Sequence, residues 1–175
     1  MRLARIPAWF PTQHEQTMNI ENDNADLHSG NAQRLSIFLK GSSRILELSP
    51  FALQGTGIGA TLCDFFAERM GSTRFDAWCA RLAALPPDGP EKAHAVEALL
   101  ADDNDRLPTR SLLYAWYTGT WMPLVDDPPP EKYEVISARA YQEALVWPLV
   151  GAHPPGAKQQ GWDAWSRPPA TPPLR

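Results

Sequence analysis

The sequence is poor in the residues that build disulfide and metal sites. It contains two cysteines and four histidines in 175 residues, and no histidine has a Cys, Asp or Glu partner at metal-site spacing. No Cys-x-x-Cys-His motif occurs, so we expect no c-type haem on this chain. We interpret Cys63 and Cys79, on consecutive predicted helices, as two buried thiols. The alternative is a disulfide between those helices, which requires an oxidising compartment.

Positive charge and long apolar runs are lacking as well. The formal net charge is −4 and the pI is about 5.5, with no basic stripe, so we expect no nucleic acid partner. No run of about 18 or more apolar residues exists, so we predict no membrane-spanning segment. The apolar stretch Ile6–Phe10 is short and contains Pro7, so we predict no signal peptide.

The sequence also lacks the motifs of catalysis and cofactor binding. The Gly55–Gly59 cluster has neither the preceding buried strand nor the spacing of a nucleotide loop, and it predicts a tight turn that opens a helix. Asp102–Asp105 lacks the glycine and glutamate of a calcium-binding EF-hand loop, and we interpret it as a solvated helix end. No Gly-x-Ser-x-Gly motif marks a serine hydrolase. We therefore predict no catalytic, cofactor-binding or metal-binding residue, which favours a binding or structural role.

Proline and tryptophan are abundant instead. The 18 prolines gather in the loop Asp126–Pro130 and in the stretch from Pro148 to the end, and the chain has seven tryptophans. Proline fixes φ and lacks the N–H donor, so long proline-rich stretches do not form regular helix or sheet. Large aromatic side chains are costly to leave in water, so seven tryptophans in a small chain indicate that some contribute to an interface.

Apolar residues at helical spacing predict an all-α fold of four to six helices. The stripes are Ile58, Leu62, Phe65, Phe66 and Met70; Phe75, Trp78, Cys79 and Leu82; Ala93, Val96, Leu99 and Leu100; Leu112, Leu113, Trp116, Tyr117 and Trp121; and Ile136, Ala140, Tyr141, Ala144 and Leu145. We expect Gly71 to end the first helix and Thr73 to cap the second. The fourth starts at Pro108, and the last runs from about Tyr133 to Trp147 and stops at Pro148.

The two ends of the chain are predicted to be extended. Residues 1–34 are polar and rich in acidic and amide side chains, which is typical of an arm that only a partner holds in place. Residues 35–48 alternate weakly, which favours a short hairpin, while Ser49-Pro50 equally favours the start of a helix. The sequence therefore predicts an irregular small helical domain over residues 35–147, an extended arm over 1–34, and a Pro- and Trp-rich extended tail over 148–175.

Aromatic residues are the candidates for contact with another protein. In a helix over Tyr114–Trp121, Trp116 and Tyr117 can share the core face, while Tyr114 lies off it. Either a neighbouring loop of the same chain or a second protein covers the outward aromatics. The predicted partner-interface residues are Tyr114, Trp116, Tyr117, Trp121, Tyr141, Trp147, Trp162 and Trp165.

Four sequence blocks resemble a known family. The chain is similar to the small (gamma) subunit of the heteromeric flavin-dependent sugar and sugar-alcohol dehydrogenases, which include sorbitol, fructose, glucose and gluconate dehydrogenases. The blocks match in order and spacing over about 125 of the 175 residues. They are Leu46–Gly57 (LELSPFALQGTG), Tyr114–Gly119 (YAWYTG), Ala140–Trp147 (AYQEALVW) and Gly161–Pro169 (GWDAWSRPP).

The resemblance implies a non-catalytic subunit that helps to fold and export its partner. That partner is a large subunit of the glucose-methanol-choline oxidoreductase type, which holds FAD and the catalytic histidine. A c-type cytochrome subunit often accepts the electrons, so haem c or an iron–sulfur cluster belongs elsewhere in the complex, and no cofactor belongs to this chain.

The sequence departs from the family pattern at two points. The family's small subunits carry a twin-arginine signal and lie in the periplasm, whereas this sequence shows no such signal, which leaves the cytoplasm as the alternative location. Gly151–Gly156 lacks the cysteine that the family often has there. The alternative functions are a stand-alone helical protein or enzyme that binds a small ligand and, as a weaker interpretation, a free cytoplasmic adaptor.

Overall fold

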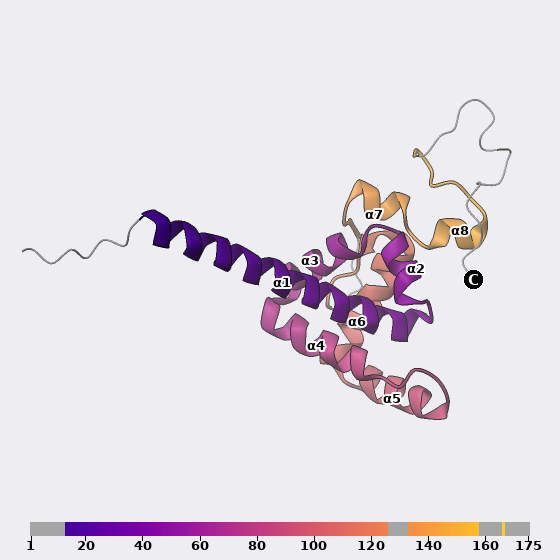
Figure 1. Cartoon of the computed structure of the whole chain (residues 1–175). Coiled ribbons are helices and arrows are strands. Elements are labelled where there is room, and N and C mark those ends of the chain that lie inside the picture. Colours follow the sequence, from indigo (N-terminus) through magenta and orange to yellow (C-terminus); the bar gives the residue numbers. More distant parts are fainter. Residues whose placement is uncertain (1–12, 126–132, 158–165, 167–175) are drawn as a thin grey trace, which may run out of the picture. The chain divides into compact units, whose positions relative to one another are not determined.

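The protein is mostly helical, which confirms the predicted all-α class. The computed structural model describes residues 13–125, 133–157 and 166, with side chains from residue 29 onward. Figure 1 traces the chain. The elements are α1 (Gln13–Leu46), α2 (Pro50–Gly55), α3 (Gly59–Met70), α4 (Ser72–Ala84), α5 (Pro90–Ala101), α6 (Asp103–Thr118), β1 (Thr120–Trp121), β2 (Glu134–Val135), α7 (Ala138–Gln142) and α8 (Val146–Val150). Within the described residues, no helix is long and apolar enough to cross a membrane.

The chain divides into two units, Met1–Arg34 and Leu35–Arg175. In the first unit, residues 13–34 form the beginning of α1, so the prediction of an extended arm is wrong there. No proline lies between Pro11 and Pro50, and low hydropathy argues against a packed core rather than against helix. Residues 1–12, which belong to the same predicted arm, lie outside the described residues.

The hairpin predicted over residues 35–48 is wrong as well, because this stretch is the last part of α1. Phe38, Leu39 and Leu46 are buried on one helix face, and Glu47 ends the helix with a φ of 58°. The alternative, a helix that begins at Ser49-Pro50, is confirmed. The hydroxyl of Ser49 accepts a hydrogen bond from the backbone N–H of Ala52 over 3.1 Å, with proline in the first turn of α2.

Helices α3 and α4 follow their predicted stripes closely. Phe66, Phe75 and Trp78 are buried, and the rings of Phe66 and Trp78 stack with centroids 5.7 Å apart. Gly71 lies between the two helices as predicted, but it also occupies the N-cap position of α4, so Thr73 does not cap that helix. Cys63 and Cys79 are both buried and form no disulfide, as the favoured interpretation predicts.

Helix α5 differs from the prediction in part of its buried face, and helix α6 differs in the residue at which it begins. In α5, Leu99 is buried and Val96 packs against the core as expected, but Ala93 and Leu100 are exposed, and Ala95 packs against the core in addition. Several alanines lie around this short helix, so its periodicity defines the buried face poorly. Helix α6 begins before Pro108, because the side chain of Asp102 accepts a hydrogen bond from the N–H of Asn104 and caps it.

The long last helix predicted over residues 133–147 is wrong. Strand β2 pairs antiparallel with β1, with Thr120 opposite Val135, and α7 begins after Ser137, whose hydroxyl accepts from the N–H of Ala140 over 2.9 Å. A short helix α8 then includes Pro148, which therefore does not stop a helix. Proline is tolerated in the first turn of a helix, where its missing N–H would have no partner. The tail beyond residue 157 is described only at Ser166.

Candidate partner-binding surface

Two of the predicted interface aromatics lie in the core of the second unit. Trp116 is fully buried; its ring stacks on Phe38 with centroids 6.3 Å apart, and its Nε1 donates to Ser42 Oγ over 3.1 Å. Trp121 is buried against Phe66, edge to face, at 5.0 Å. The prediction that these two side chains contact a partner is therefore wrong for this conformation, because α1 and α3 already cover them.

The other predicted aromatics in the described residues are only partly covered. Tyr114 lies off the core face, as predicted, and its ring stacks on Tyr133 with centroids 5.3 Å apart. A side-chain hydrogen bond with Tyr114 raises the pKa of the Tyr133 phenol above its ordinary value. Tyr117 packs partly against the core. A partner role for Tyr114 and Tyr117 stays a prediction.

Tyr141 and Trp147 tie α7 to α8 and to the segment that follows. Their rings meet edge to face at 5.3 Å, and Trp147 Nε1 donates to the carbonyl of Tyr141 over 2.6 Å. The Tyr141 hydroxyl donates to the carbonyl of Pro155 over 3.2 Å. Both side chains are half-buried, so partner contact at these residues stays a prediction. Trp162 and Trp165 lie outside the described residues.

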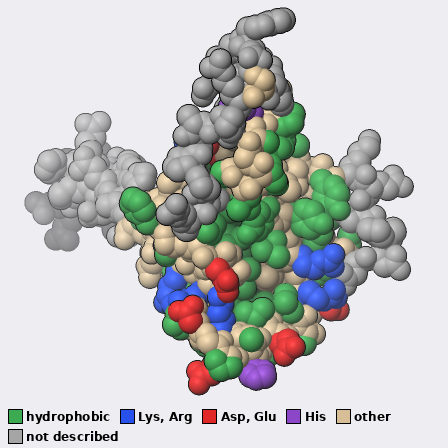
Figure 2. Space-filling model, turned by 90° about the vertical axis from the view of Figure 1, so that its right-hand side faces the viewer, with side chains coloured by type: hydrophobic (Ala, Val, Ile, Leu, Met, Phe, Trp, Pro, Cys, Tyr) green, Lys and Arg blue, Asp and Glu red, His purple; other side chains and the backbone are tan. Residues whose placement is uncertain are grey.

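The most exposed large apolar side chains are residues that the sequence reasoning did not select. Among the described residues they are Phe51, Val150 and Leu149, with exposed fractions of 84%, 64% and 55%. The exposure of Phe51 follows from its position in α2, because Leu53 is buried and a residue two positions away on a helix points to the opposite side. Figure 2 views the side of the molecule on which α2 and α8 lie in Figure 1, and apolar side chains gather in the middle of that face.

Three of the four sequence blocks meet in space. Gly119 ends α6 with a φ of +70°, and a Cβ built on it would lie 2.6 Å from the carbonyl oxygen of Ala140. The N–H of Leu145 donates to the carbonyl of Trp116 over 2.9 Å. Gly57, also at +70°, is covered by the guanidinium of Arg139, where a Cβ would collide. The second block therefore packs directly on the third, and the first block reaches the start of α7.

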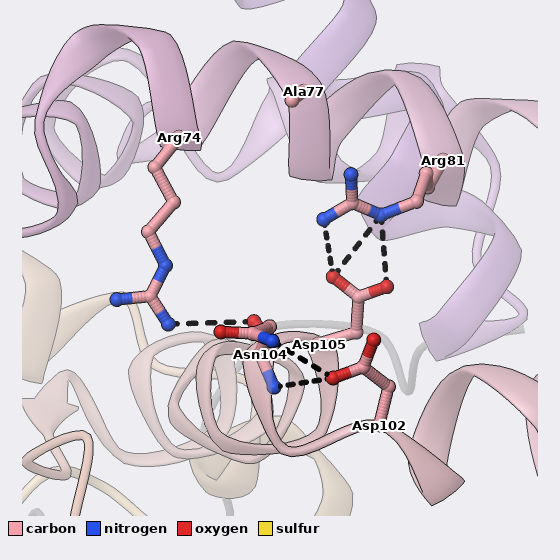
Figure 3. Close-up of a pocket in the computed structure, with 6 residues that line it drawn as sticks. All are labelled: Arg74, Ala77, Arg81, Asp102, Asn104 and Asp105. Atoms are coloured by element: carbon pink, nitrogen blue, oxygen red, sulfur yellow. Dashed lines mark hydrogen bonds and ion pairs between the residues drawn. The ribbon is translucent and has the colours of Figure 1, made fainter.

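A polar hollow of about 410 Å³ lies between α4 and the first turn of α6 (Figure 3). Its lining residues are Arg74, Ala77, Arg81, Asp102, Asn104 and Asp105. Asp102, Asp103 and Asn104 are exposed at the start of α6, as the interpretation of a solvated helix end predicts, whereas Asp105 is buried. Arg81 Nε donates to the Asp105 carboxylate over 2.8 Å. This hydrogen bond raises the pKa of the Arg81 guanidinium.

The other groups of the hollow are bonded to one another as well. Pro108 has no N–H to donate to the carbonyl of Asn104, and Arg74 points its guanidinium at that oxygen from 3.5 Å. Asp102 accepts from the Asn104 backbone N–H over 2.9 Å. The arrangement offers charged and hydrogen-bonding contacts to a small polar molecule.

The described part of the chain has no candidate metal site. Among residues 13–125, 133–157 and 166, no three His, Cys, Asp or Glu side chains come together in a way that could hold a metal ion.

No protein-family model, curated protein or solved structure matches the chain.

Proposed function

We propose that this chain is a non-catalytic small subunit that stabilises a larger protein. The proposed partner is the FAD-containing large subunit of a sugar or polyol dehydrogenase, of the glucose-methanol-choline type, with a c-type cytochrome as a further subunit. Help with export of that partner to the periplasm belongs to the same proposal. FAD is assigned to the partner, where it would accept electrons from the sugar, and this chain supplies surface rather than chemistry.

The observation that carries the proposal is the meeting of the sequence blocks that resemble the family. Chance similarity would not require Tyr114–Gly119 to pack on Ala140–Trp147, yet the Gly119 backbone fits against Ala140 and the Trp116 carbonyl accepts from Leu145. Both glycines have left-handed φ angles, and at Gly119 a Cβ would also collide with the backbone of Ala140, so glycine has a physical reason to be at these positions. The sequence blocks that carry the resemblance therefore lie in contact with one another in the fold, and are not separate short matches.

The exposed apolar side chains support the same proposal. A folded chain that leaves a phenylalanine and two aliphatic residues largely in water gains free energy when another protein covers them. The three side chains lie on helices with defined ends, so they are available to a partner without unfolding the domain.

Co-expression tests the proposal. A large FAD-containing subunit of a sugar or polyol dehydrogenase is produced in a bacterial host with and without this chain, and the soluble, FAD-loaded yield is measured from the flavin absorbance. We expect the yield to depend on this chain, with the two proteins eluting together from a sizing column. Equal FAD-loaded yields in both cases would rule out a stabilising subunit.

The polar hollow between α4 and α6 favours a second candidate, a stand-alone protein that binds a small polar ligand. Its volume lies in the range of ligand pockets, although such pockets are mostly apolar and this one is lined by charged residues. On this alternative, the isolated chain is monodisperse, and a small ligand raises its melting temperature. Aggregation of the chain expressed alone, with rescue by the large subunit, argues for the first candidate.

A further inference from the structure

We infer that the polar hollow between α4 and α6 is a binding site for a small zwitterion, a molecule with one carboxylate and one ammonium group such as an amino acid or a short peptide. Arg74 binds the carboxylate and Asp102 binds the ammonium group. The inference goes beyond the proposed subunit role, because the hollow belongs to this chain with or without a large subunit. It also names the ligand class for the second candidate function.

One wall of the hollow is a single face of α4. Arg74, Ala77 and Arg81 follow one another at intervals of three and four residues, so they lie on the same side of the helix, and all three are exposed. Figure 3 shows the two arginines reaching from α4 toward the start of α6, with Ala77 between them. Because Ala77 has only a methyl group, the middle of the hollow stays open. Its volume of about 410 Å³ is in the size range of small-molecule sites.

One pair of charges in the hollow is already satisfied. Arg81 Nε donates to both carboxylate oxygens of Asp105, over 3.1 and 2.8 Å. The Asp105 side chain is 8% exposed, so this carboxylate is held in place by burial as well as by the ion pair. The pair has no net charge. The kind of ligand that fits the hollow therefore depends on the two remaining charged residues, Arg74 and Asp102.

Arg74 and Asp102 both have hydrogen-bonding capacity left for a ligand. A guanidinium carries several N–H donors, and within the described residues that of Arg74 makes one contact, with the carbonyl of Asn104 at 3.5 Å. Asp102 Oδ1 accepts from the backbone N–H and the side-chain amide of Asn104, over 2.9 and 3.1 Å. Its Oδ2 accepts no hydrogen bond from the described part of the chain. Asn104 is thus bonded to both residues, which form no ion pair with each other there.

The opposite charges of Arg74 and Asp102 decide the chemistry of the ligand. A simple anion pairs with Arg74 but is repelled by Asp102, and a simple cation meets the reverse situation. An uncharged molecule forms weaker contacts, because hydrogen bonds to ionised groups are about twice as strong as neutral ones. A zwitterion pairs with both residues and leaves neither charge desolvated without a partner. The hollow therefore favours a carboxylate and an ammonium group on one small molecule.

Isothermal titration calorimetry of the full chain tests the inference. The probes are glycine, γ-aminobutyrate and triglycine, whose two charges are increasingly far apart, and the reference ligands are butyrate and butylamine, which carry one charge each. We expect at least one zwitterion to bind about tenfold or more tightly than either reference, because each reference lacks one charge-assisted hydrogen bond. If the chain is soluble only together with a large subunit, the complex is titrated in its place.

Variants of the hollow locate the binding. Arg74→Gln and Asp102→Asn should each weaken binding of the zwitterion by about tenfold or more. Asparagine caps a helix as well as aspartate does, so Asp102→Asn keeps the start of α6. Lys40→Gln and Asp64→Asn make the same charge changes at exposed residues of α1 and α3, and should bind like the unchanged chain. Ala77→Leu fills the hollow without changing its charge; it should also weaken binding, and it replaces any charge variant that fails to fold.

The outcomes separate the zwitterion site from the proposed subunit role. The inference is overturned if no zwitterion binds, if butyrate or butylamine binds as tightly, or if the variants of the hollow bind like the unchanged chain. An equal loss of affinity in the Lys40 and Asp64 variants would also overturn it, because the effect would then come from net charge. None of these results bears on the subunit role, which the FAD-loaded yield of the large subunit decides. Equal FAD-loaded yields, in turn, would leave the zwitterion site standing.

Discussion

The indole nitrogen of Trp116 donates a hydrogen bond to the hydroxyl of Ser42 over 3.1 Å, and both side chains are fully buried. This contact joins the last turn of α6 to the last turns of α1, across 74 residues of sequence. It explains why a tryptophan and a serine are tolerated in an apolar core: each satisfies the polar group of the other. The neighbouring Phe38 completes the packing by stacking on the indole ring.

Ser42→Ala should therefore destabilise the fold. The substitution leaves the Trp116 N–H buried without an acceptor, which costs about 1–3 kcal/mol in the free energy of unfolding. Ser36→Ala, at an exposed serine of the same helix, is the control and should change stability by less than about 0.5 kcal/mol. Urea denaturation of the two variants and the unchanged chain measures the difference. Equal stability of all three proteins would show that the Trp116–Ser42 hydrogen bond contributes nothing.

Gly119→Ala should destabilise the protein more than a glycine substitution elsewhere. The residue needs a φ of +70°, and a Cβ would lie 2.5 Å from the carbonyl carbon of Ala140, so both backbone strain and collision oppose alanine. We expect a loss of about 2–4 kcal/mol. Gly151→Ala has a similar φ of +62° with no atom within 4 Å of the added Cβ, and should cost only about 1 kcal/mol.

Thermal unfolding of the two glycine variants measures this difference. The comparison isolates the contact between α6 and α7, because the backbone strain is common to both variants and the collision occurs only at Gly119. Similar melting temperatures for the two variants would mean that α7 moves away at little cost, and that the meeting of the two sequence blocks is not tightly packed.

The ion pair between Glu47 and Lys92 predicts a pH dependence of stability. A hydrogen bond and the charge of Lys92, 2.8 Å away, lower the pKa of the Glu47 carboxyl below its ordinary value of 4.5. A carboxyl with a lowered folded-state pKa stabilises the fold above its unfolded pKa, and the contribution is lost as the pH falls through the folded value. Glu47→Gln should therefore be less stable than the unchanged chain at neutral pH and equally stable in acid.

Urea denaturation of Glu47→Gln at several pH values and two salt concentrations measures this contribution. Because Glu47 is exposed, we expect the difference to be small and to shrink at high salt. A difference that grows as the pH falls would have the wrong sign for this pair and would assign the effect to another group.

The two cysteines should react slowly in the folded protein. Cys63 and Cys79 are both buried, so a thiol reagent reaches them only when the fold opens. Titration with a chromogenic disulfide reagent should detect neither thiol quickly under native conditions and both of them in denaturant without reductant. If the denatured protein shows no thiol until reductant is added, a disulfide has formed and the buried-thiol interpretation is wrong.

Much of the fold could be predicted because apolar periodicity in α3 and α4 was strong and their ends carried glycine. The prediction failed where such signals were weak or common to two structures. The region from Tyr133 to Trp147 has helical spacing, yet Ser137 caps a new helix and Val135 pairs with Thr120. The pairing of Val135 with Thr120, on the other side of the intervening loop, has no signature in the residues of β2 alone.

The candidate site was harder to predict than the fold. Tryptophan and tyrosine were taken as interface residues by type, and Trp116 and Trp121 proved to be core. Residue type alone does not separate a core aromatic from an interface aromatic, because both avoid water for the same reason. The exposure of Phe51 could have been predicted, because a six-residue helix that buries Leu53 has its opposite side in solvent.

The sequence by itself determined that the chain is helical, that its core includes the stripe residues Phe66, Phe75 and Trp78, and where Gly71 ends a helix. These properties follow from local periodicity and backbone preference, which each segment carries alone. Only the tertiary structure decided that α1 covers Trp116, that Gly119 lies against Ala140, and that Phe51 stays in water. Burial depends on which segments meet, and that is settled by the packing of the whole chain rather than by any one stretch of it.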